Sequence, residues 1–178
     1  MSSLSLQQYL SIIDPMLFAL LKTIRRAFET QPGILWAISE DIAIFLYSYA
    51  SRVTPINMED SHLHINVCIR NTLEASMLDA VIEELKKQGF VQASSTKEHL
   101  TLQYSLSPTT IIISYSKKPL EVIWMRNRKG KATYPLLEPN DLMRKKKAEI
   151  EKMGMMEKAV EWEKYDWMKE VINYIVIE

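Results

Sequence analysis

The sequence of 178 residues lacks several features that would decide its class at once. It has a single cysteine, Cys68, which excludes an intrachain disulfide framework and a cysteine-rich zinc site. Its 22 basic and 22 acidic residues cancel, so the chain lacks the charge excess of a general nucleic-acid binder. No apolar run reaches the roughly 20 residues that span a bilayer, and the first residues do not resemble a signal peptide. These absences predict a cytoplasmic protein in which any basic surface is local.

Apolar side chains, in contrast, are plentiful: they make up 47% of the residues, against 25% that are charged. This balance predicts one compact unit and excludes disordered and fibrous chains. Within that unit we expect an N-terminal helical segment at 1–33, an α/β core at 34–134 and a C-terminal helical region at 135–178. The sequence contains no internal repeat that would suggest another organisation.

The spacing of apolar residues predicts the secondary structure. Intervals of three and four predict helices over 4–28, 42–50 and 71–88, and a helical region that starts at Pro139 and is interrupted at Gly154. Alternation and short apolar runs predict strands over 34–38, 62–69, 100–106, 109–115 and 120–125. We therefore expect an α+β fold, with a mixed β-sheet packed by helices. The expected core residues are Trp36, Leu63, Ile65, Val67, Leu78, Ile82 and Leu85.

Several local segments carry a resemblance to a known family. They are the apolar run at 33–39, the alternating strand at 62–69, the amphipathic helix that ends at Phe90, and two further stretches at 120–123 and 134–158. In these segments the chain resembles small archaeal-type nucleotidyltransferase-fold proteins of the DNA polymerase β-like superfamily. The resemblance implies a nucleotidyltransferase-like fold.

The resemblance also implies where nucleotide phosphate would bind. In the family, a Gly-Ser pair after the first strand holds the phosphate. Here Ser39 ends that strand, and Glu40 and Asp41 occupy the place of the pair. Two carboxylates repel a triphosphate, and neither residue allows the close backbone approach that glycine gives. The phosphate site is therefore expected to be altered.

The metal-binding positions differ as well. The family binds Mg²⁺ with an Asp-x-Asp pair on the next strand and a third carboxylate from a neighbouring strand. This sequence offers His62, His64 and Asn66 on that strand, and Glu121 matches the third carboxylate. One acid is too few for phosphoryl transfer with two metal ions. The resemblance thus implies degenerate catalytic motifs, with Glu121 as the one candidate catalytic residue. We expect no cofactor, and Mg²⁺ or another divalent metal only if the protein is active.

The two histidines allow a second interpretation of the same strand. His62 and His64 lie two residues apart on one strand face and could bind a transition metal, with Cys68 or Glu121 as a further ligand. The alternative is a polar, partly exposed strand face, since this spacing occurs on any strand. For Cys68 we expect a buried, unreactive position.

Basic residues are concentrated in one part of the chain. Residues 117–152 contain eleven basic and five acidic residues, a net charge of +6. Such a segment forms a solvated turn and helix face, which we favour, or binds phosphates of a nucleotide or a nucleic acid. Together with Ser39, the candidate phosphate-binding residues are Arg126, Arg128, Lys129 and Lys131.

Three functions fit these observations. We favour a divergent, non-catalytic nucleotidyltransferase-fold protein that binds a nucleotide, a nucleic acid or a protein partner, with no membrane involved. An active nucleotidyltransferase with unconventional metal ligands is an alternative, and an antitoxin-like interaction subunit is another. The ten methionines and the aromatic residues Trp162, Trp167 and Tyr174 near the C-terminus belong either to the core or to a protein-binding surface.

Overall fold

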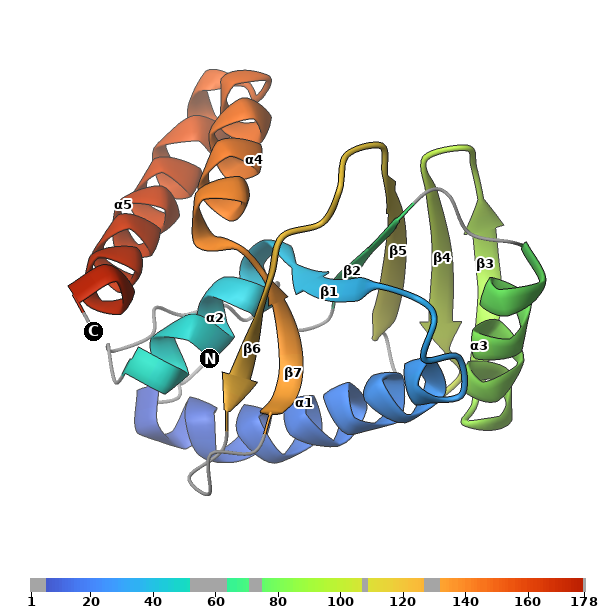
Figure 1. The fold of residues 1–178 in the computed structure, drawn as a ribbon. Coiled ribbons are helices and arrows are strands. Elements are labelled where there is room, and N and C mark those ends of the chain that lie inside the picture. Colours follow the sequence, from blue (N-terminus) through green and yellow to red (C-terminus); the bar gives the residue numbers. More distant parts are fainter. Residues whose placement is uncertain (1–5, 52–63, 71–74, 107–108, 127–131, 178) are drawn as a thin grey trace. The chain divides into compact units, whose positions relative to one another are not determined.

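The computed structural model describes residues 6–51, 64–70, 75–106, 109–126 and 132–177 (Figure 1). The chain divides into two compact units, each made from two stretches of sequence. The first unit contains residues 1–36 and 59–120, and the second contains residues 37–58 and 121–178. This division differs from the expected succession of segments, because each unit joins stretches that are far apart in the sequence. The segment boundaries after residues 33 and 134 stay a prediction.

The described part of the first unit contains two helices and four strands. The helices are α1 (Leu6–Glu29) and α3 (Ala75–Lys87), and they pack against each other. The strands lie side by side in the order β3-β4-β5-β2 (Figure 1). They are β2 (His64–Arg70), β3 (Phe90–Ser95), β4 (His99–Tyr104) and β5 (Thr110–Ser116). Strand β2 pairs with β5 in parallel, whereas β4 pairs with both β3 and β5 in antiparallel fashion.

The core of the first unit comes from alternate strand residues and from one stripe of each helix. The buried strand residues include Ile65, Val67, Ile69, Leu102, Ile111 and Ile113. The buried helix residues include Leu21, Ile24, Phe28, Leu78, Val81, Ile82 and Leu85. Phe28 stacks on Trp36 with ring centroids 4.6 Å apart. The expected core residues are buried, apart from Leu63, which lies outside the described residues.

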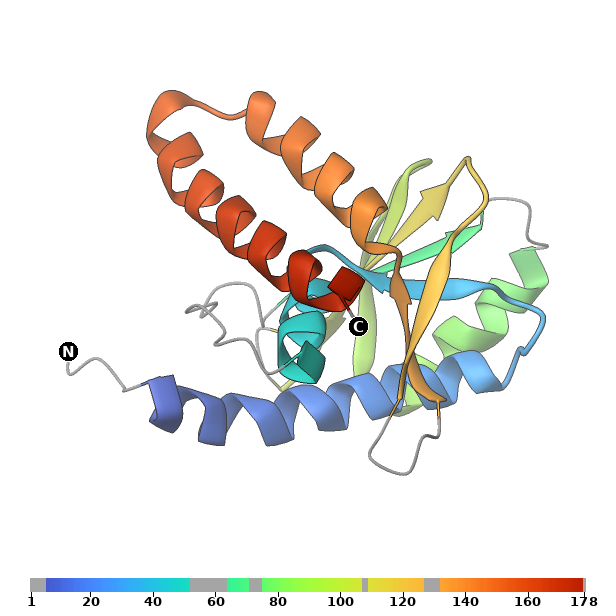
Figure 2. The ribbon, with the colours of Figure 1, turned by 60° about the vertical axis from the view of Figure 1, so that its left-hand side comes forward.

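Three helices and three strands make up the second unit, as far as its residues are described. The strands are β1 (Trp36–Ser39), β6 (Val122–Arg126) and β7 (Ala132–Leu137), and the helices are α2 (Glu40–Ser51), α4 (Pro139–Glu151) and α5 (Met155–Ile177). Strand β7 pairs with β1 in parallel and with β6 in antiparallel fashion. The three helices pack on one another, and α4 and α5 form an antiparallel hairpin (Figure 2). The buried Tyr47 hydroxyl donates a hydrogen bond to the Leu137 carbonyl, 2.8 Å away, and so links α2 to the end of β7.

The fold is α+β with mixed strand pairing, as the sequence predicts. Strands β3 and β7 were not predicted from the sequence, and each has a physical reason. Five of the six residues of β3 are exposed, and its large apolar residues Phe90 and Val91 are adjacent, so its sequence shows no alternation. Strand β7 contains Pro135, a residue that argues against a strand because it cannot donate a ladder hydrogen bond. Among the helices that the structure describes, none has the length and apolar character needed to cross a membrane.

Two glycines make a matched pair for a stability test. Gly89 lies in the turn between α3 and β3 with φ at +100°, and a Cβ there would lie 2.9 Å from the Tyr104 ring. Gly154 separates α4 from α5 and has open space around it. We expect Gly89→Ala to lower the free energy of unfolding by about 1–3 kcal/mol, and Gly154→Ala to leave it unchanged or raise it by up to about 1 kcal/mol. Urea denaturation measures both, and equal effects of the two variants would contradict the described turn.

Candidate functional site

The junction of β1 and α2 is the place where the resemblance puts the phosphate-binding pair. Ser39 is buried at the end of β1, and Glu40 follows it with φ at 59°. Glu40 is the one non-glycine residue with a positive φ in the part of the chain that the structure describes. This left-handed conformation costs an L-residue about 1–2 kcal/mol, whereas glycine adopts it freely. The backbone at Glu40 therefore has the conformation that suits the glycine of the family motif, although the side chain is a glutamate.

The first turn of α2 carries its own negative charge. Glu40 and Asp41 are both in this turn. The N-terminus of a helix has partly positive, unsatisfied N–H groups and attracts anions such as phosphate. Here two carboxylates of the chain already provide that negative charge. A phosphate group that approached this helix end would meet repulsion from both of them.

Asp41 is also part of a buried ion-pair cluster of the second unit. The Lys146 side chain on α4 is only 6% exposed, and its Nζ lies 3.3 Å from Asp41 Oδ1. The same ammonium pairs with the carboxylate of Glu161 on α5. Burial by itself lowers the pKa of Lys146, but Asp41 and Glu161 outweigh it, so that the pKa is raised and the lysine stays charged. One cation therefore joins α2, α4 and α5.

The environment of Glu40 disfavours its charged form. Burial raises the pKa of Glu40 most, and the negative charges of Glu149 and Asp41 raise it further. Lys145 and Lys146 oppose this shift without cancelling it. Glu40 is thus a partly buried acid that combines an unfavourable backbone conformation with an unfavourable charge.

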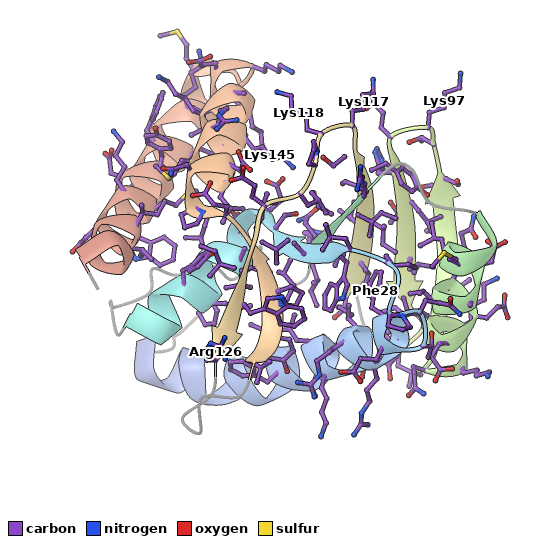
Figure 3. The ribbon with its side chains drawn as sticks, in the orientation of Figure 1. Phe28, Lys97, Lys117, Lys118, Arg126 and Lys145 are labelled. Atoms are coloured by element: carbon purple, nitrogen blue, oxygen red, sulfur yellow. The ribbon has the colours of Figure 1, made fainter. Side chains whose placement is uncertain are left out.

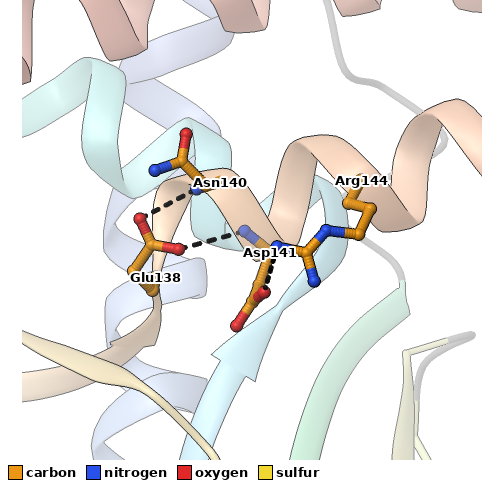
Figure 4. Close-up of polar contacts among 4 residues, drawn as sticks. All are labelled: Glu138, Asn140, Asp141 and Arg144. Carbon is orange, nitrogen blue, oxygen red and sulfur yellow. Dashed lines mark hydrogen bonds and ion pairs between the residues drawn. The ribbon is translucent and has the colours of Figure 1, made fainter.

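A second group of acids lies where α4 begins (Figure 4). Carboxylate oxygens of Glu121, Glu138 and Asp141 all lie within 4.8 Å of one another. Such oxygens suit a hard divalent cation. However, both oxygens of Glu138 already accept backbone N–H groups, from Asn140 at 3.0 Å and from Asp141 at 3.1 Å (Figure 4).

The remaining contacts of this acidic group are also internal. Asp141 pairs with Arg144 at 3.2 Å, and the Glu138 N–H donates to the Glu121 carbonyl at 2.9 Å. The group is therefore explained as the N-terminal cap of α4. Sequence reasoning singled out Glu121 and missed the other two acids, although an acid directly before Pro139 is a recognisable helix start.

The predicted metal ligands fall into different units. His64 is exposed and Asn66 is half-buried on β2, Cys68 is buried on the same strand as expected, and His62 lies outside the described residues. In the first unit β2 pairs with β5, a strand without a carboxylate.

Glu121 belongs to the second unit, directly before β6, and β6 pairs with β7. The resemblance matches Glu121 to a carboxylate on a strand next to β2, whereas the strand that follows Glu121 pairs with β7. The imidazole of His64 does not match the oxygen-rich coordination that Mg²⁺ requires, and Asn66 offers one neutral amide oxygen in place of a carboxylate. Metal binding by these residues stays a prediction.

The predicted phosphate-binding residues are only partly described. Arg126 is exposed at the end of β6, and Ser39 is buried at the end of β1. The three other candidates, Arg128, Lys129 and Lys131, lie outside the described residues. Their role stays a prediction. At the C-terminus, Trp167 is buried, as its assignment to the core requires.

Two substitutions of Glu40 separate the free-energy cost of its partly buried charge from the cost of its left-handed backbone. Because the pKa of Glu40 is raised above 4.5 in the folded state, its contribution to stability is present below pH 4.5 and is lost as the pH rises through the folded-state value. Glu40→Gln should therefore gain stability over the parent protein as the pH rises through this window. Glu40→Gly should gain about 1 kcal/mol more at every pH, because it also relieves the left-handed backbone. Urea denaturation across a pH series measures both, and a pH-independent difference between Glu40→Gln and the parent would contradict the assignment.

Removing the buried cation should be costly. Lys146→Met removes the buried cation that the partly buried Asp41 and Glu161 share, and we expect a loss of about 3 kcal/mol in the free energy of unfolding, the low end for breaking a buried ion pair. The triple variant Asp41→Asn, Lys146→Met, Glu161→Gln should be more stable than Lys146→Met alone, because the two acidic charges that Lys146 balances are removed with it. Additive losses in the triple variant would contradict a shared ion cluster. As a surface control, Lys147→Met should change stability by less than about 0.5 kcal/mol.

Comparison with known proteins finds a similar fold and no matching sequence. No family model and no curated protein matches the chain. Among solved structures, it is similar to the antibiotic-resistance factor ANT(2'')-Ia, an aminoglycoside nucleotidyltransferase. The match has a TM-score of 0.56 and 10% sequence identity, and it covers 92% of this chain and 95% of that chain. At this identity the likeness shows the fold alone, so the chain has a nucleotidyltransferase-like α+β fold.

Proposed function

We propose that this chain is a divergent nucleotidyltransferase-fold protein that does not transfer nucleotides and acts by binding a nucleotide, a nucleic acid or a protein partner. The observation that carries the proposal is the first turn of α2. There Glu40 and Asp41 replace the phosphate-binding pair, and Asp41 is held by the buried Lys146. A nucleoside triphosphate at this helix end would have to compete with the chain's own carboxylates for the same positive charge.

The pair of parallel strands β2 and β5 supports the proposal independently. Phosphoryl transfer depends on divalent cations held by carboxylates against the reacting phosphate. The sequences His64–Arg70 and Thr110–Ser116 contain no acidic residue. These strands therefore offer no site of the Asp-x-Asp kind that the resemblance implies.

An active nucleotidyltransferase is the second candidate, and the acids at the start of α4 favour it. Glu121, Glu138 and Asp141 are close enough together to share one divalent cation. Such a cation would have to compete with the backbone N–H groups for Glu138 and with Arg144 for Asp141. Because these contacts stabilise the start of α4, we rank this candidate second.

A transfer assay tests the proposal. Purified protein is incubated with labelled ATP, GTP, CTP or UTP, with Mg²⁺ or Mn²⁺, and with RNA, a protein or an aminoglycoside as acceptor. We expect no incorporation of label above the level without protein, because both the phosphate cradle and the metal carboxylates are replaced. Incorporation that Glu121→Gln abolishes would overturn the proposal and favour the second candidate.

A reversion variant tests the physical reason behind the expected result. Glu40→Gly with Asp41→Ser removes both carboxylates and leaves Lys146 with Glu161 as its remaining acidic partner in the ion-pair cluster. We expect this variant to bind a nucleoside triphosphate at least about tenfold more tightly than the parent, since each removed charge contributes on the order of 1 kcal/mol of repulsion at contact distance in water. Glu163→Gln with Glu170→Gln, which removes two exposed acids from α5, is the control for the same change in net charge. Calorimetric titration of ATP measures the affinities, and equal affinity of the reversion variant and the parent would contradict the proposed block.

A further inference from the structure

Four basic residues gather at one end of the sheet of the first unit. Arg70 ends β2, Lys117 and Lys118 follow β5, and Lys97 lies in the turn between β3 and β4. All four side chains are exposed. We call this group the basic edge. It shares only Lys117 and Lys118 with the basic segment recognised in the sequence, because Arg70 and Lys97 come from elsewhere in the chain.

The backbone fixes these residues at the same end. Arg70 is the register partner of Ser116, and the Tyr115 N–H donates to the Glu98 carbonyl at 3.0 Å. The Ser116 hydroxyl donates to the Lys118 carbonyl at 2.9 Å, which closes the turn after β5. Figure 3 shows Lys97, Lys117 and Lys118 pointing away from the strands. The sheet therefore presents these lysines together.

The basic edge is not neutralised by ion pairs. Among the described residues, no acidic side chain pairs with any of its four members within 4.0 Å. Other lysines of the same unit differ, since Lys86 pairs with Glu83 and Lys87 pairs with Glu84 on α3. The positive charge of the basic edge is thus available to a ligand.

Two acidic residues reduce that charge without removing it. Glu98 follows Lys97 in the same turn, and Asp79 of α3 acts on Tyr115 near the end of β5. The pKa of Tyr115 is raised first by burial and then by the charge of Asp79. Four cations against two anions leave an excess of two positive charges. This excess attracts anions and is too small to bind a single small one tightly.

The spacing of the basic edge fits a chain of phosphates. Its members come from β2, from the end of β5 and from the β3–β4 turn, so they extend across the strand order β3-β4-β5-β2. At about 4.8 Å for each strand spacing, this row is roughly 14 Å long. A nucleic-acid strand carries a charge about every 3.4 Å along its axis and can follow such a row, whereas one phosphate group reaches only part of it.

The residues around the basic edge favour contact with a phosphate backbone over contact with stacked bases or a membrane. The exposed large apolar residues of the described first unit are Leu35, Val91 and Leu106. None of them is aromatic, and Tyr115, the aromatic residue at this end of β5, is only partly exposed, so no fully exposed platform for stacked bases accompanies the lysines. None lies in the turns that form the basic edge, so this surface has no apolar wedge for a membrane.

We propose that the basic edge binds the phosphate backbone of a nucleic acid without reading its bases. This inference rests on the binding role of the proposed function, of which it names one partner class, and it does not depend on the absence of catalysis.

Fluorescence anisotropy with the full chain tests the proposal. The probes are a labelled single-stranded RNA and a labelled DNA duplex of about 20 residues, at salt concentrations from roughly 50 to 250 mM. We expect the affinity to fall steeply with salt, with a slope of about −2 to −4 in log K against log salt for three or four neutralised phosphates. We also expect little difference between base sequences. The two probes distinguish a single strand from a duplex as the source of the phosphates.

A matched pair of variants locates the binding site. Lys97→Gln, Lys117→Gln, Lys118→Gln should lower the affinity at least about tenfold and flatten the salt slope by about 2 to 3. The control Lys22→Gln, Lys86→Gln, Lys87→Gln removes the same charge from the same unit but should leave affinity and slope unchanged. Thermal unfolding checks that both variants fold.

Three results would overturn the inference. They are the absence of binding at the lowest salt, equal losses in the two triple variants, and tighter binding to vesicles of anionic phospholipid than to either nucleic acid. The transfer assay and the nucleotide titration are separate experiments on the second unit. Failure of the proposed function is therefore distinguishable from failure of this inference.

Discussion

The buried ammonium group of Lys146 is the constraint on which the candidate site depends. It pairs with Asp41, which is 105 positions away in the sequence, and with Glu161. A single buried charge costs several kcal/mol, so it persists only where partners compensate it. The three helices that supply these groups must therefore stay together for any of the charges to be buried. The first turn of α2 has a fixed environment for this reason.

That environment also bears on how the first turn of α2 would meet an anion. In a phosphate-binding helix terminus, the anion arrives with the ligand, and the free protein keeps an unsatisfied positive end. Here the negative charge belongs to the chain and lies in the first turn of the helix without a ligand. The backbone at Glu40 is left-handed, although a glutamate gains nothing from this conformation. A conformation suited to a glycine is thus combined with side chains whose charge would repel a phosphate.

Local patterns in the sequence predict most of the fold and only part of the site. An apolar residue that recurs at the strand or helix period predicts its own burial. This holds for the alternation at Ile65 and Val67 and for the helical stripe of Leu78, Ile82 and Leu85, all of which are buried. A strand such as β7, with a proline and few alternating residues, is formed by its partners and leaves no local signal.

The ion-pair cluster of Asp41, Lys146 and Glu161 could not be predicted from the sequence for a related reason. The run from Arg144 to Lys147 resembles a solvated helix face, and nothing in it marks Lys146 as the residue that points inward. Only the pairing with Asp41, from a distant stretch of the chain, decides that. For Glu121 the resemblance names a strand position, whereas the structure shows a residue before β6 that also lies near Glu138 and Asp141.

The distribution of paired and unpaired charge separates two kinds of electrostatic behaviour in one neutral chain. In the second unit, buried acids and bases neutralise each other at short range, so their energy contributes to stability and is little affected by salt. In the basic edge of the first unit, exposed cations without ion-pair partners contribute little to stability, and their field is screened over a distance of about 10 Å. Replacing charges in the ion cluster should therefore change the unfolding free energy. Replacing charges in the basic edge should change only the binding of anions and its dependence on salt.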